Sequence, residues 1–340
     1  MRAAVCREYG PPEVVRVEDL PPPALGPGQV RVGVRAAAVN YPDVLLVAGE
    51  YQVKLPVPFV PGSEYAGIVT EVAGDVTRPR VGDRVFGTTM AGAFGTEIAV
   101  AAETVRVMPA GLDDRVAAAF GVAHRTAYHV LRSVACLQRG EELVVLGAGG
   151  GVGLAAVQIG ALMGTTVTAV ASSAAKLDAA AASGARHLVN HTAGDLREAL
   201  RRVLPGGADV VVDPVGGDLA EPALRALRWA GRFVTVGYAS GVIPRIPLNL
   251  VLLKGIRILG FQLRDLAAHR PDEVRRNEEE LIGLLAGGYV TPRIGAVFAL
   301  EQAAAALRYV ADGRAVGKVV LDVSAPAPQW PDRAGTSAST

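Results

Sequence analysis

Apolar and polar residues alternate along short segments in the first third of the chain. The segment 29–39, QVRVGVRAAAV, alternates as a half-buried strand does, because successive side chains of a strand point to opposite faces. Segments 64–74 and 84–89 predict further strands, and RPRVGDRV contains a turn signal. Residues 1–118 therefore predict a β-rich unit with a twisted, barrel-like antiparallel arrangement.

The pattern changes near residue 113. Residues 113–137 have helical spacing, and Asp113 and Asp114 are suited to a helix start. Strands then alternate with helices, and among these we expect a helix over 219–231 and a strand over 232–239. Alternation at this spacing predicts βαβ units and a parallel sheet that helices cover on both faces.

The last part of the chain predicts mixed elements. A strand is expected over 255–263, helices over 275–288 and 300–313, and a final strand over 317–323. Residues 325–340 are rich in Pro, Ser and Ala with little apolar content, so we expect a disordered tail there.

Composition narrows the class of protein. The chain has 340 residues, half of them hydrophobic, which favours about two domains with a large core. The net charge is +1, and no basic stripe with interleaved aromatic residues points to nucleic acid as a partner. No apolar run approaches the roughly 20 residues of a membrane helix, and the start of the chain has no apolar signal region. We expect neither a nucleic-acid nor a membrane partner.

The two cysteines, Cys6 and Cys136, lie far apart and form no C-x-x-C pair. This usage fits a reducing cytoplasm and argues against a disulfide framework or a cysteine-built zinc site. Both residues are expected to be small buried apolar side chains.

A glycine-rich loop, GAGGGVG, joins an expected strand to an expected helix at 147–153. Glycine lets a strand turn sharply into a helix, lets a pyrophosphate approach the backbone, and lets the helix pack tightly on the strand. The free N–H groups at the helix start then face the phosphates. The pattern predicts a dinucleotide site formed by Gly147, Gly150, Gly151, Val152 and Gly153; the alternative is a turn without a ligand.

The end of the next strand indicates which dinucleotide binds. NAD sites usually carry Asp or Glu about 20 residues after the loop, bonded to the ribose 2′-hydroxyl. This chain has Ser172 and Ser173 there, with Lys176 one helical turn later. Two hydroxyls and an ammonium suit a 2′-phosphate. We therefore predict NADPH as the cofactor, although the serines also suit helix capping.

These motifs together resemble the zinc-independent quinone oxidoreductases of the medium-chain dehydrogenase/reductase superfamily, over about residues 1–323. The supporting stretches are AAAVNYPDVLLVAGEYQVKLPVPFVPGSEYAGIV, VGDRV, GAGGGVGLAAVQIG, DPVGGD and GKVVL. The resemblance implies an α/β fold with a GroES-like β-rich catalytic domain (1–118 and 256–324) and a Rossmann NADPH-binding domain (119–255). It also implies a homodimer that pairs through 255–263.

The sequence lacks the zinc ligands of the zinc-dependent relatives. Zinc-dependent relatives use Cys and His near the start of the chain and near the PGSE stretch, whereas PGSEYAG has no His and neither cysteine lies at such a position. A zinc site needs about four N, S or O ligands, and no such set is evident. We therefore expect no metal, and we expect reduction of an already electrophilic acceptor, a quinone or an activated C=C bond.

The resemblance also implies the catalytic side chains. Asn40, Asp43 and Tyr51 would lie near the nicotinamide, where Asn40 could orient the ring or a carbonyl. Tyr41 and Tyr51 could each donate a hydrogen bond to the substrate. Alternatively, Tyr51 packs against the PFVPG turn. Asp43 is expected to serve mainly as a partner at a helix start.

The chain departs from the family at two histidines and one arginine. His124 stands where relatives carry Tyr, and it could act as a general acid, or only bond the cofactor ribose or cap a helix. Arg125 replaces a usual Gly and could form a salt bridge or contact a phosphate or an acidic substrate. His191 replaces a Tyr after Asn190 and would lie near the 2′-phosphate.

Further cofactor contacts are expected where the parallel strands end, because ligands bind at the carboxyl ends of such sheets. Phe261 would approach the carboxamide, or else pack in the core. The other residues expected there are Asp213, Val215, Gly237, Tyr238 and Ser240.

Three functions remain open. The first is an NADPH-dependent reductase of quinones or α,β-unsaturated carbonyl compounds. The second is a non-catalytic NADPH-binding redox sensor. The third is a specialised biosynthetic reductase of a larger enone or an enoyl thioester, whose pocket would be enlarged or would carry positive charge at Arg125 or Arg264.

Overall fold

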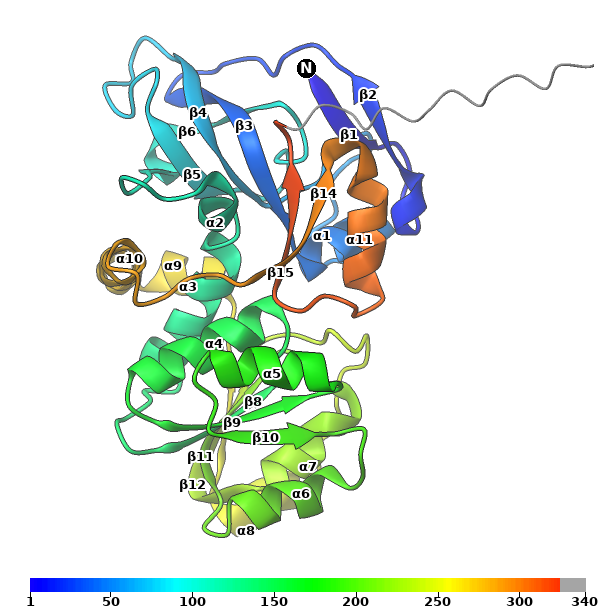
Figure 1. Cartoon of the computed structure of the whole chain (residues 1–340), viewed down its shortest axis with the longest axis vertical. Helices are drawn as coiled ribbons and strands as arrows, with labels where there is room; N and C mark the ends of the chain where they lie inside the picture. The colour runs from blue at the N-terminus through cyan, green and yellow to red at the C-terminus, as the bar shows by residue number, and fades with distance from the viewer. Residues whose placement is uncertain (325–340) are drawn as a thin grey trace, which may run out of the picture.

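The computed structural model describes residues 1–324 as two lobes, one β-rich and one built on a parallel sheet (Figure 1). The tail predicted at 325–340 lies outside the described residues. Among residues 1–324, no helix is both long and apolar enough to cross a membrane.

A seven-stranded sheet forms most of the β-rich lobe, in the order β14-β15-β3-β4-β5-β7 with β6 beside β3. Its pairs are antiparallel except β14 and β15. Val319 of β15 lies opposite Val39 of β3, so two strands far apart along the chain pair in this sheet. The strands are β3 (Gln29–Val39), β4 (Glu64–Val72), β5 (Arg84–Thr88), β6 (Glu97–Ala101), β7 (Val105–Val107), β14 (Ile294–Ala299) and β15 (Lys318–Asp322).

Shorter elements complete this lobe. A separate two-stranded antiparallel sheet consists of β1 (Arg2–Cys6) and β2 (Val15–Asp19). Two helices, α1 (Tyr41–Ala48) and α11 (Ala303–Ala311), contact each other at one side of the lobe. The 3-10 turns are η1 (Pro12–Val14), η2 (Ala102–Thr104) and η5 (Leu300–Gln302). The predicted β-rich unit is confirmed.

The second lobe has a six-stranded sheet in the order β10-β9-β8-β11-β12-β13, and every pair in it is parallel. The strands are β8 (Glu142–Leu146), β9 (Thr166–Ala171), β10 (His187–Asn190), β11 (Ala208–Asp213), β12 (Leu227–Thr235) and β13 (Arg257–Gly260). This is the predicted Rossmann sheet. Because β13 pairs with β12, the sheet continues beyond residue 255, where the Rossmann domain was predicted to end.

Helices cover both faces of this sheet, with α4 and α5 on one side and α6, α7 and α8 on the other (Figure 1). The apolar strands explain the arrangement, because β11 is buried at every position and must be covered twice. The helices are α4 (Gly151–Leu162), α5 (Ala174–Ala182), α6 (Leu196–Val203), α7 (Ala220–Arg225) and α8 (Leu248–Lys254), with the 3-10 turn η4 (Gly217–Leu219) before α7.

Two predicted helices differ from the structure. Residues 113–137 form three pieces: α2 (Asp114–Ala118), α3 (Gly121–His129) and the π-helical turn η3 (Val130–Val134). The helix predicted over 219–231 was wrong beyond Arg225, because β12 already begins at Leu227. Ala230 has φ of +60°, which a right-handed helix does not allow.

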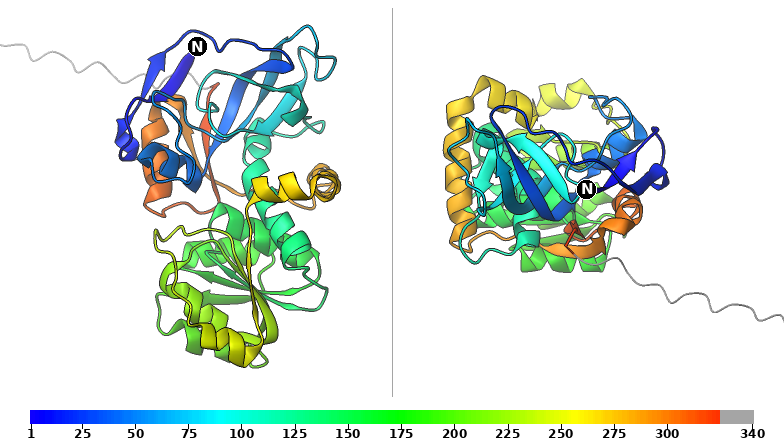
Figure 2. Two further views of the ribbon diagram at one scale, coloured as in Figure 1. Left: turned by 180° about the vertical axis from the view of Figure 1, so that it is seen from behind. Right: turned by 90° about the horizontal axis from the view of Figure 1, so that it is seen from above.

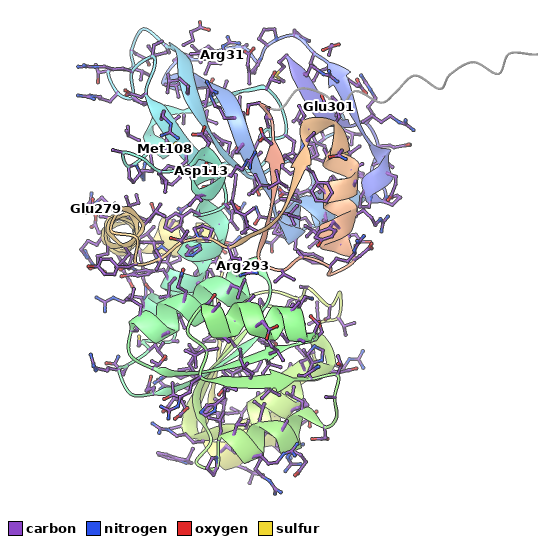
Figure 3. The ribbon with its side chains drawn as sticks, viewed as in Figure 1. Arg31, Met108, Asp113, Glu279, Arg293 and Glu301 are labelled. Atoms are coloured by element: carbon purple, nitrogen blue, oxygen red, sulfur yellow. The ribbon has the colours of Figure 1, made fainter. Side chains whose placement is uncertain are left out.

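The lobes meet at α3, at α9 (Leu263–His269) and α10 (Pro271–Ala286), and along the segment that follows α10 (Figure 2). Arg293, in that segment, lies between the lobes (Figure 3). One apolar core runs through the junction, since Ala66 and Val320 of the β-rich lobe pack in the same cluster as Val145 of β8. The packing therefore fixes the glycine loop beside the β-rich lobe.

Candidate active site

The glycine loop turns from β8 into α4, as predicted. Gly147 has φ of +59°, a conformation that favours glycine. A Cβ atom on Gly153 would lie 2.1 Å from the carbonyl oxygen of Gly147, so only glycine allows the helix to pack this closely on the loop. Gly150 is the N-cap of α4, and no side chain caps it. Its uncapped N–H groups suit a phosphate.

Ser172, Lys176 and His191 come together at the carboxyl ends of β9 and β10. The Lys176 ammonium donates to Ser172 Oγ at 3.3 Å and to the carbonyl oxygen of Gly313 at 2.7 Å. The His191 N–H bonds the carbonyl of Ala171. Burial lowers the pKa of Lys176, and burial followed by the charge of Lys176 lowers the pKa of His191. The residues present fit a 2′-phosphate, because a dianion would offset this lysine's lost hydration.

Ser173 has a capping role. Its Oγ accepts the backbone N–H of Lys176 at 3.4 Å, at the start of α5. The capping alternative foreseen for the serines therefore describes Ser173, whereas Ser172 is the serine that contacts the lysine ammonium.

The loops after β11 and β12 are joined to each other. Asp213 Oδ1 accepts the backbone N–H groups of Val215 and Gly216, each at 2.8 Å, and burial raises the pKa of Asp213. The Ser240 N–H bonds the carbonyl of Val215 at 3.0 Å. Asp213 thus shapes the turn that carries Val215, and the turn holds the loop of 237–240. Tyr238 is half-exposed at this edge, and the Phe261 N–H bonds the carbonyl of Thr235 at 3.3 Å.

Asn40 lies in a buried polar cluster with Glu64 and Lys318. The Lys318 ammonium donates to Asn40 Oδ1 and to Glu64 Oε1, both at 2.6 Å. The Asn40 amide donates to Glu64 Oε1 at 2.7 Å and to Ser63 Oγ at 3.2 Å. Glu64 is 0% exposed and Lys318 is 4% exposed. An ammonium has three donors, and two are used here, so one remains for a ligand.

The same cluster joins four parts of the fold. Glu64 begins β4, Lys318 begins β15, and Asn40 is the N-cap residue before α1. Glu64 Oε2 accepts the backbone N–H of Val122 in α3 at 2.7 Å. A Cβ atom on Gly151 would lie 2.8 Å from Lys318 Cδ, so the lysine stem crosses the start of α4. The cluster therefore lies next to the predicted phosphate site.

Sequence reasoning missed Glu64 and Lys318. They are separated by 254 residues along the chain, so no local spacing connects them. A signal did exist, because each is a charged residue directly before an apolar run, in EYAGIV and in KVVL. Charged residues are almost never fully buried unless they are paired.

Asp43 is completely buried below this cluster. Its Oδ2 accepts the backbone N–H of Asn40 at 2.7 Å, which is the helix-start role expected for it. Burial raises the pKa of Asp43 to about 7, although the bond from Asn40 acts in the opposite direction.

The two candidate phenols lie at opposite ends of α1. Tyr41 is its first residue, and burial, followed by the charge of Glu50, raises the pKa of Tyr41. Tyr51 follows the helix, is partly exposed, and its hydroxyl lies 3.5 Å from Gln52 Nε2. Within residues 1–324, no hydrogen bond joins either phenol to the Asn40 cluster.

His124 is an interior residue. It is 3% exposed, stacks on Phe120 with ring centroids 4.8 Å apart, and lies 3.3 Å from Gln158 Oε1 through Nε2. Burial lowers the pKa of His124 to about 4, so the ring is neutral at pH 7. The same Gln158 oxygen accepts the backbone N–H of Thr291. The histidine thus belongs to a contact among α3, α4 and the segment after α10.

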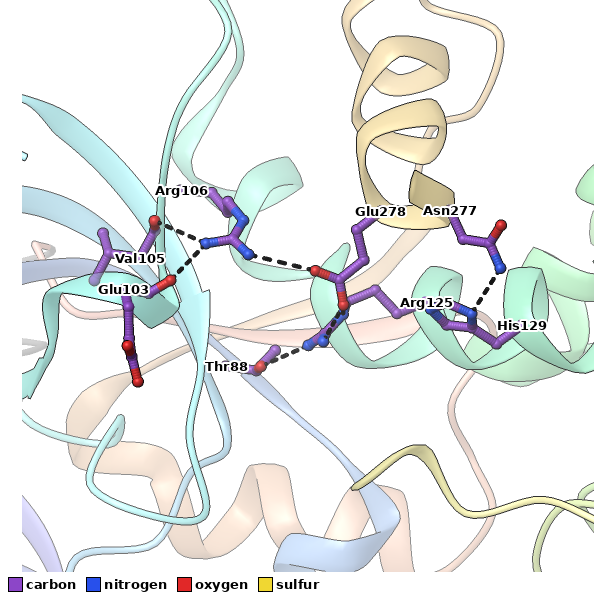
Figure 4. Close-up of polar contacts among 8 residues, drawn as sticks. All are labelled: Thr88, Glu103, Val105, Arg106, Arg125, His129, Asn277 and Glu278. Carbon is purple, nitrogen blue, oxygen red and sulfur yellow. Dashed lines mark hydrogen bonds and ion pairs between the residues drawn. The ribbon is translucent and has the colours of Figure 1, made fainter. Parts of the chain in front are cut away.

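Arg125 forms the salt bridge that was one of its expected roles. Its guanidinium pairs with Glu278 of α10 and donates to Thr88 Oγ1 at 2.8 Å (Figure 4). The other arginine considered, Arg264, is exposed and lies 3.9 Å from Asp265.

The positions of the His, Cys, Asp and Glu side chains decide whether a metal ion could be held. Among residues 1–324, no group of three or more His, Cys, Asp or Glu could hold a metal ion. Cys6 is buried and Cys136 is exposed, and both are free thiols. The prediction that both cysteines are buried is confirmed for Cys6. It was wrong for Cys136, which lies in the segment after η3.

Comparison with known proteins agrees with this architecture. The sequence profile of the Alcohol dehydrogenase GroES-like domain matches residues 26–120, and that of Zinc-binding dehydrogenase matches residues 151–282. A GroES-like domain joined to a Rossmann domain defines the medium-chain dehydrogenase/reductase superfamily.

Individual relatives narrow the class. Quinone oxidoreductase-like protein 2 of Bos taurus is 35% identical over 324 residues, which cover 95% of this chain and 92% of the relative. Escherichia coli quinone oxidoreductase complexed with NADPH is 25% identical with a TM-score of 0.87, covering 95% and 100% of the two chains. A mycobacterial protein complexed with NADPH is 27% identical with a TM-score of 0.88, covering 94% and 99%. The chain belongs to the quinone oxidoreductase-like family of oxidoreductases.

Proposed function

We propose that the protein is an NADPH-dependent reductase of quinones or α,β-unsaturated carbonyl compounds. The observation that carries the proposal is the group of Ser172, Lys176 and His191 beside the glycine loop, in a chain whose relatives include NADPH complexes. No carboxylate follows β9 between residues 172 and 176, so nothing there repels a 2′-phosphate.

The remaining predicted contacts complete the proposed cofactor site. NADPH supplies a hydride from its nicotinamide when bound. The glycine loop and the uncapped start of α4 would hold the pyrophosphate, with the ammonium of Lys318 nearby as a positive charge. The turn at Asp213 and Val215 and the loop carrying Gly237, Tyr238 and Ser240 would line the nicotinamide end.

The Asn40 cluster suggests how the acceptor is polarised. Asn40 cannot orient a ligand freely, because both ends of its amide are already bonded. We propose that the remaining N–H of Lys318 stabilises charge on the acceptor oxygen or on the cofactor. Reduction then consumes one hydride and one proton, and Tyr41, Tyr51 or water would supply the proton. The burial and low pKa of His124 favour a positioning role over general acid catalysis.

The cofactor assignment is tested by Lys176→Glu. Loss of a charge-assisted contact of about 1.5–3 kcal/mol should raise KM for NADPH by about tenfold or more. KM for NADH should change little, because NADH has no 2′-phosphate. Arg201→Glu, an equal charge change on exposed α6, is the control. Equal effects of Lys176→Glu on both cofactors would contradict the assignment.

A reductase of a larger enone or an enoyl thioester is the second candidate. It is favoured by the guanidinium of Arg125, which stands where the family usually carries Gly. A non-catalytic NADPH-binding redox sensor would bind NADPH tightly and turn over no acceptor.

We also propose a cytoplasmic location, which the free thiols of Cys6 and Cys136 suit.

We further propose a homodimer through β13. Within residues 1–324 this strand pairs only with β12, so its other edge is open. Large apolar side chains gather on this part of the lobe, and their exposed fractions reach 77% at Trp229 and 81% at Leu252. Light scattering should give twice the chain mass for the wild type and a lower mass for Leu252→Glu. A wild-type monomer at micromolar concentration would contradict the dimer.

A further inference from the structure

A cavity lies on the α10 side of α3. It has a volume of 540 Å³ and is bounded by β5, η2, β7, α3, α9 and α10. None of its lining residues belongs to the predicted cofactor site. Figure 1 shows α9 and α10 on one side of α3, and α1 and α11 on the other. The volume is within the range of about 300–1,000 Å³ that small-molecule sites occupy.

The wall of this cavity is apolar over much of its area and basic at one end. Phe86, Phe120, Leu281 and Ile282 supply the apolar part. Arg106 and Arg125 supply the basic part, and Glu278 and Glu103 also line the cavity.

The carboxylate of Glu278 is held between the two guanidinium groups (Figure 4). Arg125 Nε donates to its Oε1 at 2.8 Å, whereas Arg106 Nη2 reaches its Oε2 only at 3.5 Å. The protein thus already places one carboxylate at this position, and the arginine on one side of it is loosely bound.

The two arginines retain binding capacity. A guanidinium has five N–H donors, and Arg106 uses Nη1 on the backbone carbonyl of Glu103 at 2.7 Å. Within residues 1–324, Arg106 Nε makes no hydrogen bond, and its side chain is 43% exposed. Two guanidinium charges face the one carboxylate of Glu278, while the carboxylate of Glu103 points away from Arg106 in Figure 4. Around Glu278 the two guanidinium groups therefore leave one positive charge, and the carboxylate of Glu103 is exposed to solvent.

We propose that this cavity binds an amphipathic monocarboxylate, with the ligand carboxylate on Arg106 and Arg125 and its aliphatic chain along Phe86, Phe120 and Leu281. A single residual charge matches a monoanion better than a phosphate dianion. The apolar wall matches an alkyl chain, and guanidinium groups bind carboxylates through paired hydrogen bonds. This site is separate from the proposed reductase chemistry and goes beyond it.

Isothermal titration calorimetry with octanoate tests the site, using the full chain without cofactor, and 1-octanol as the uncharged probe. We expect octanoate to bind at least about tenfold more tightly than octanol, because charge-assisted hydrogen bonds contribute to only one of them. Arg106→Gln should remove that difference. Arg276→Gln, an exposed arginine on α10 outside the cavity, should keep it.

Glu278→Gln provides a second, opposite test. It removes the carboxylate that competes for the arginines, so octanoate should bind about tenfold more tightly than to the wild type. A purely structural ion pair would give no such gain. Equal binding of octanoate and octanol, no binding of octanoate, or an unchanged affinity in Arg106→Gln would overturn the proposal. Because NADPH is absent, failure here leaves the reductase proposal standing.

Discussion

Two charged clusters connect α3 with the β-rich lobe, and they differ in burial. Glu64 and Lys318 are almost completely buried, and both oxygens of the carboxylate accept hydrogen bonds. Glu278 and Arg125 line an open cavity, beside the half-exposed Arg106. In the first cluster the loss of one partner would leave a buried charge unpaired, so the geometry is fixed. In the second cluster, water or a ligand can replace a lost hydrogen-bond partner.

The largest effect is expected where the buried cluster is broken. Lys318→Met leaves the carboxylate of Glu64 buried without its cation, and should lower the free energy of unfolding by about 3–5 kcal/mol. Urea denaturation at pH 7.5 measures this loss. Glu64→Gln combined with Lys318→Met should recover part of it, because no buried charge remains. A loss below about 1 kcal/mol in the single variant would show that the pair is not buried as described.

An intermediate effect is expected at His124, and it depends on pH. The pKa of His124 is lowered from 6.5 to about 4 in the folded state, so the unfolded chain binds the proton more readily. This group therefore costs stability as the pH falls from 6.5 to about 4, and the whole effect is about 3 kcal/mol.

His124→Phe should remove this acid sensitivity, since it keeps the stacking on Phe120 and cannot be protonated. Urea denaturation at several pH values between 7 and 4 measures it. His269→Gln, at an exposed histidine, is the matched control. If the two variants lose stability in parallel with the wild type on acidification, His124 is not a buried neutral residue.

The smallest effect is expected at the cavity cluster. Glu278→Gln should lower the free energy of unfolding by about 1 kcal/mol or less, because water reaches the two arginines and the amide still accepts hydrogen bonds. The same urea titration measures it. A loss as large as that of Lys318→Met would abolish the distinction between the two clusters.

The sequence predicted the features that depend on neighbouring residues. The glycine loop follows from positions 147–153 alone, and Ser172 and Lys176 follow from the end of the next strand. The alternation of strands and helices predicted the parallel sheet, since each element is an uninterrupted local pattern. The helix over 219–231 was wrong at its end, because β12 begins at Leu227 and contains the positive φ of Ala230, neither of which the helical spacing reveals.

The features that the sequence did not predict depend on residues that only the fold brings together. Glu64 begins β4 and Lys318 begins β15, two strands of one sheet that are far apart along the chain. The environment of His124 depends on Gln158 in α4 and on Thr291 beyond α10. Burial of this kind decides the charge state of a histidine, and the spacing of residues along the chain does not predict that burial.

The central claim is reduction of an electrophilic acceptor by NADPH, and turnover measures it directly. Purified protein would be supplied with NADPH or NADH and a panel of quinones, simple enones and enoyl thioesters, and loss of the reduced nicotinamide absorbance followed. We predict turnover of at least one acceptor class, with kcat/KM at least about tenfold higher for NADPH than for NADH. Equal use of both cofactors, or tight NADPH binding without turnover of any acceptor, would contradict it.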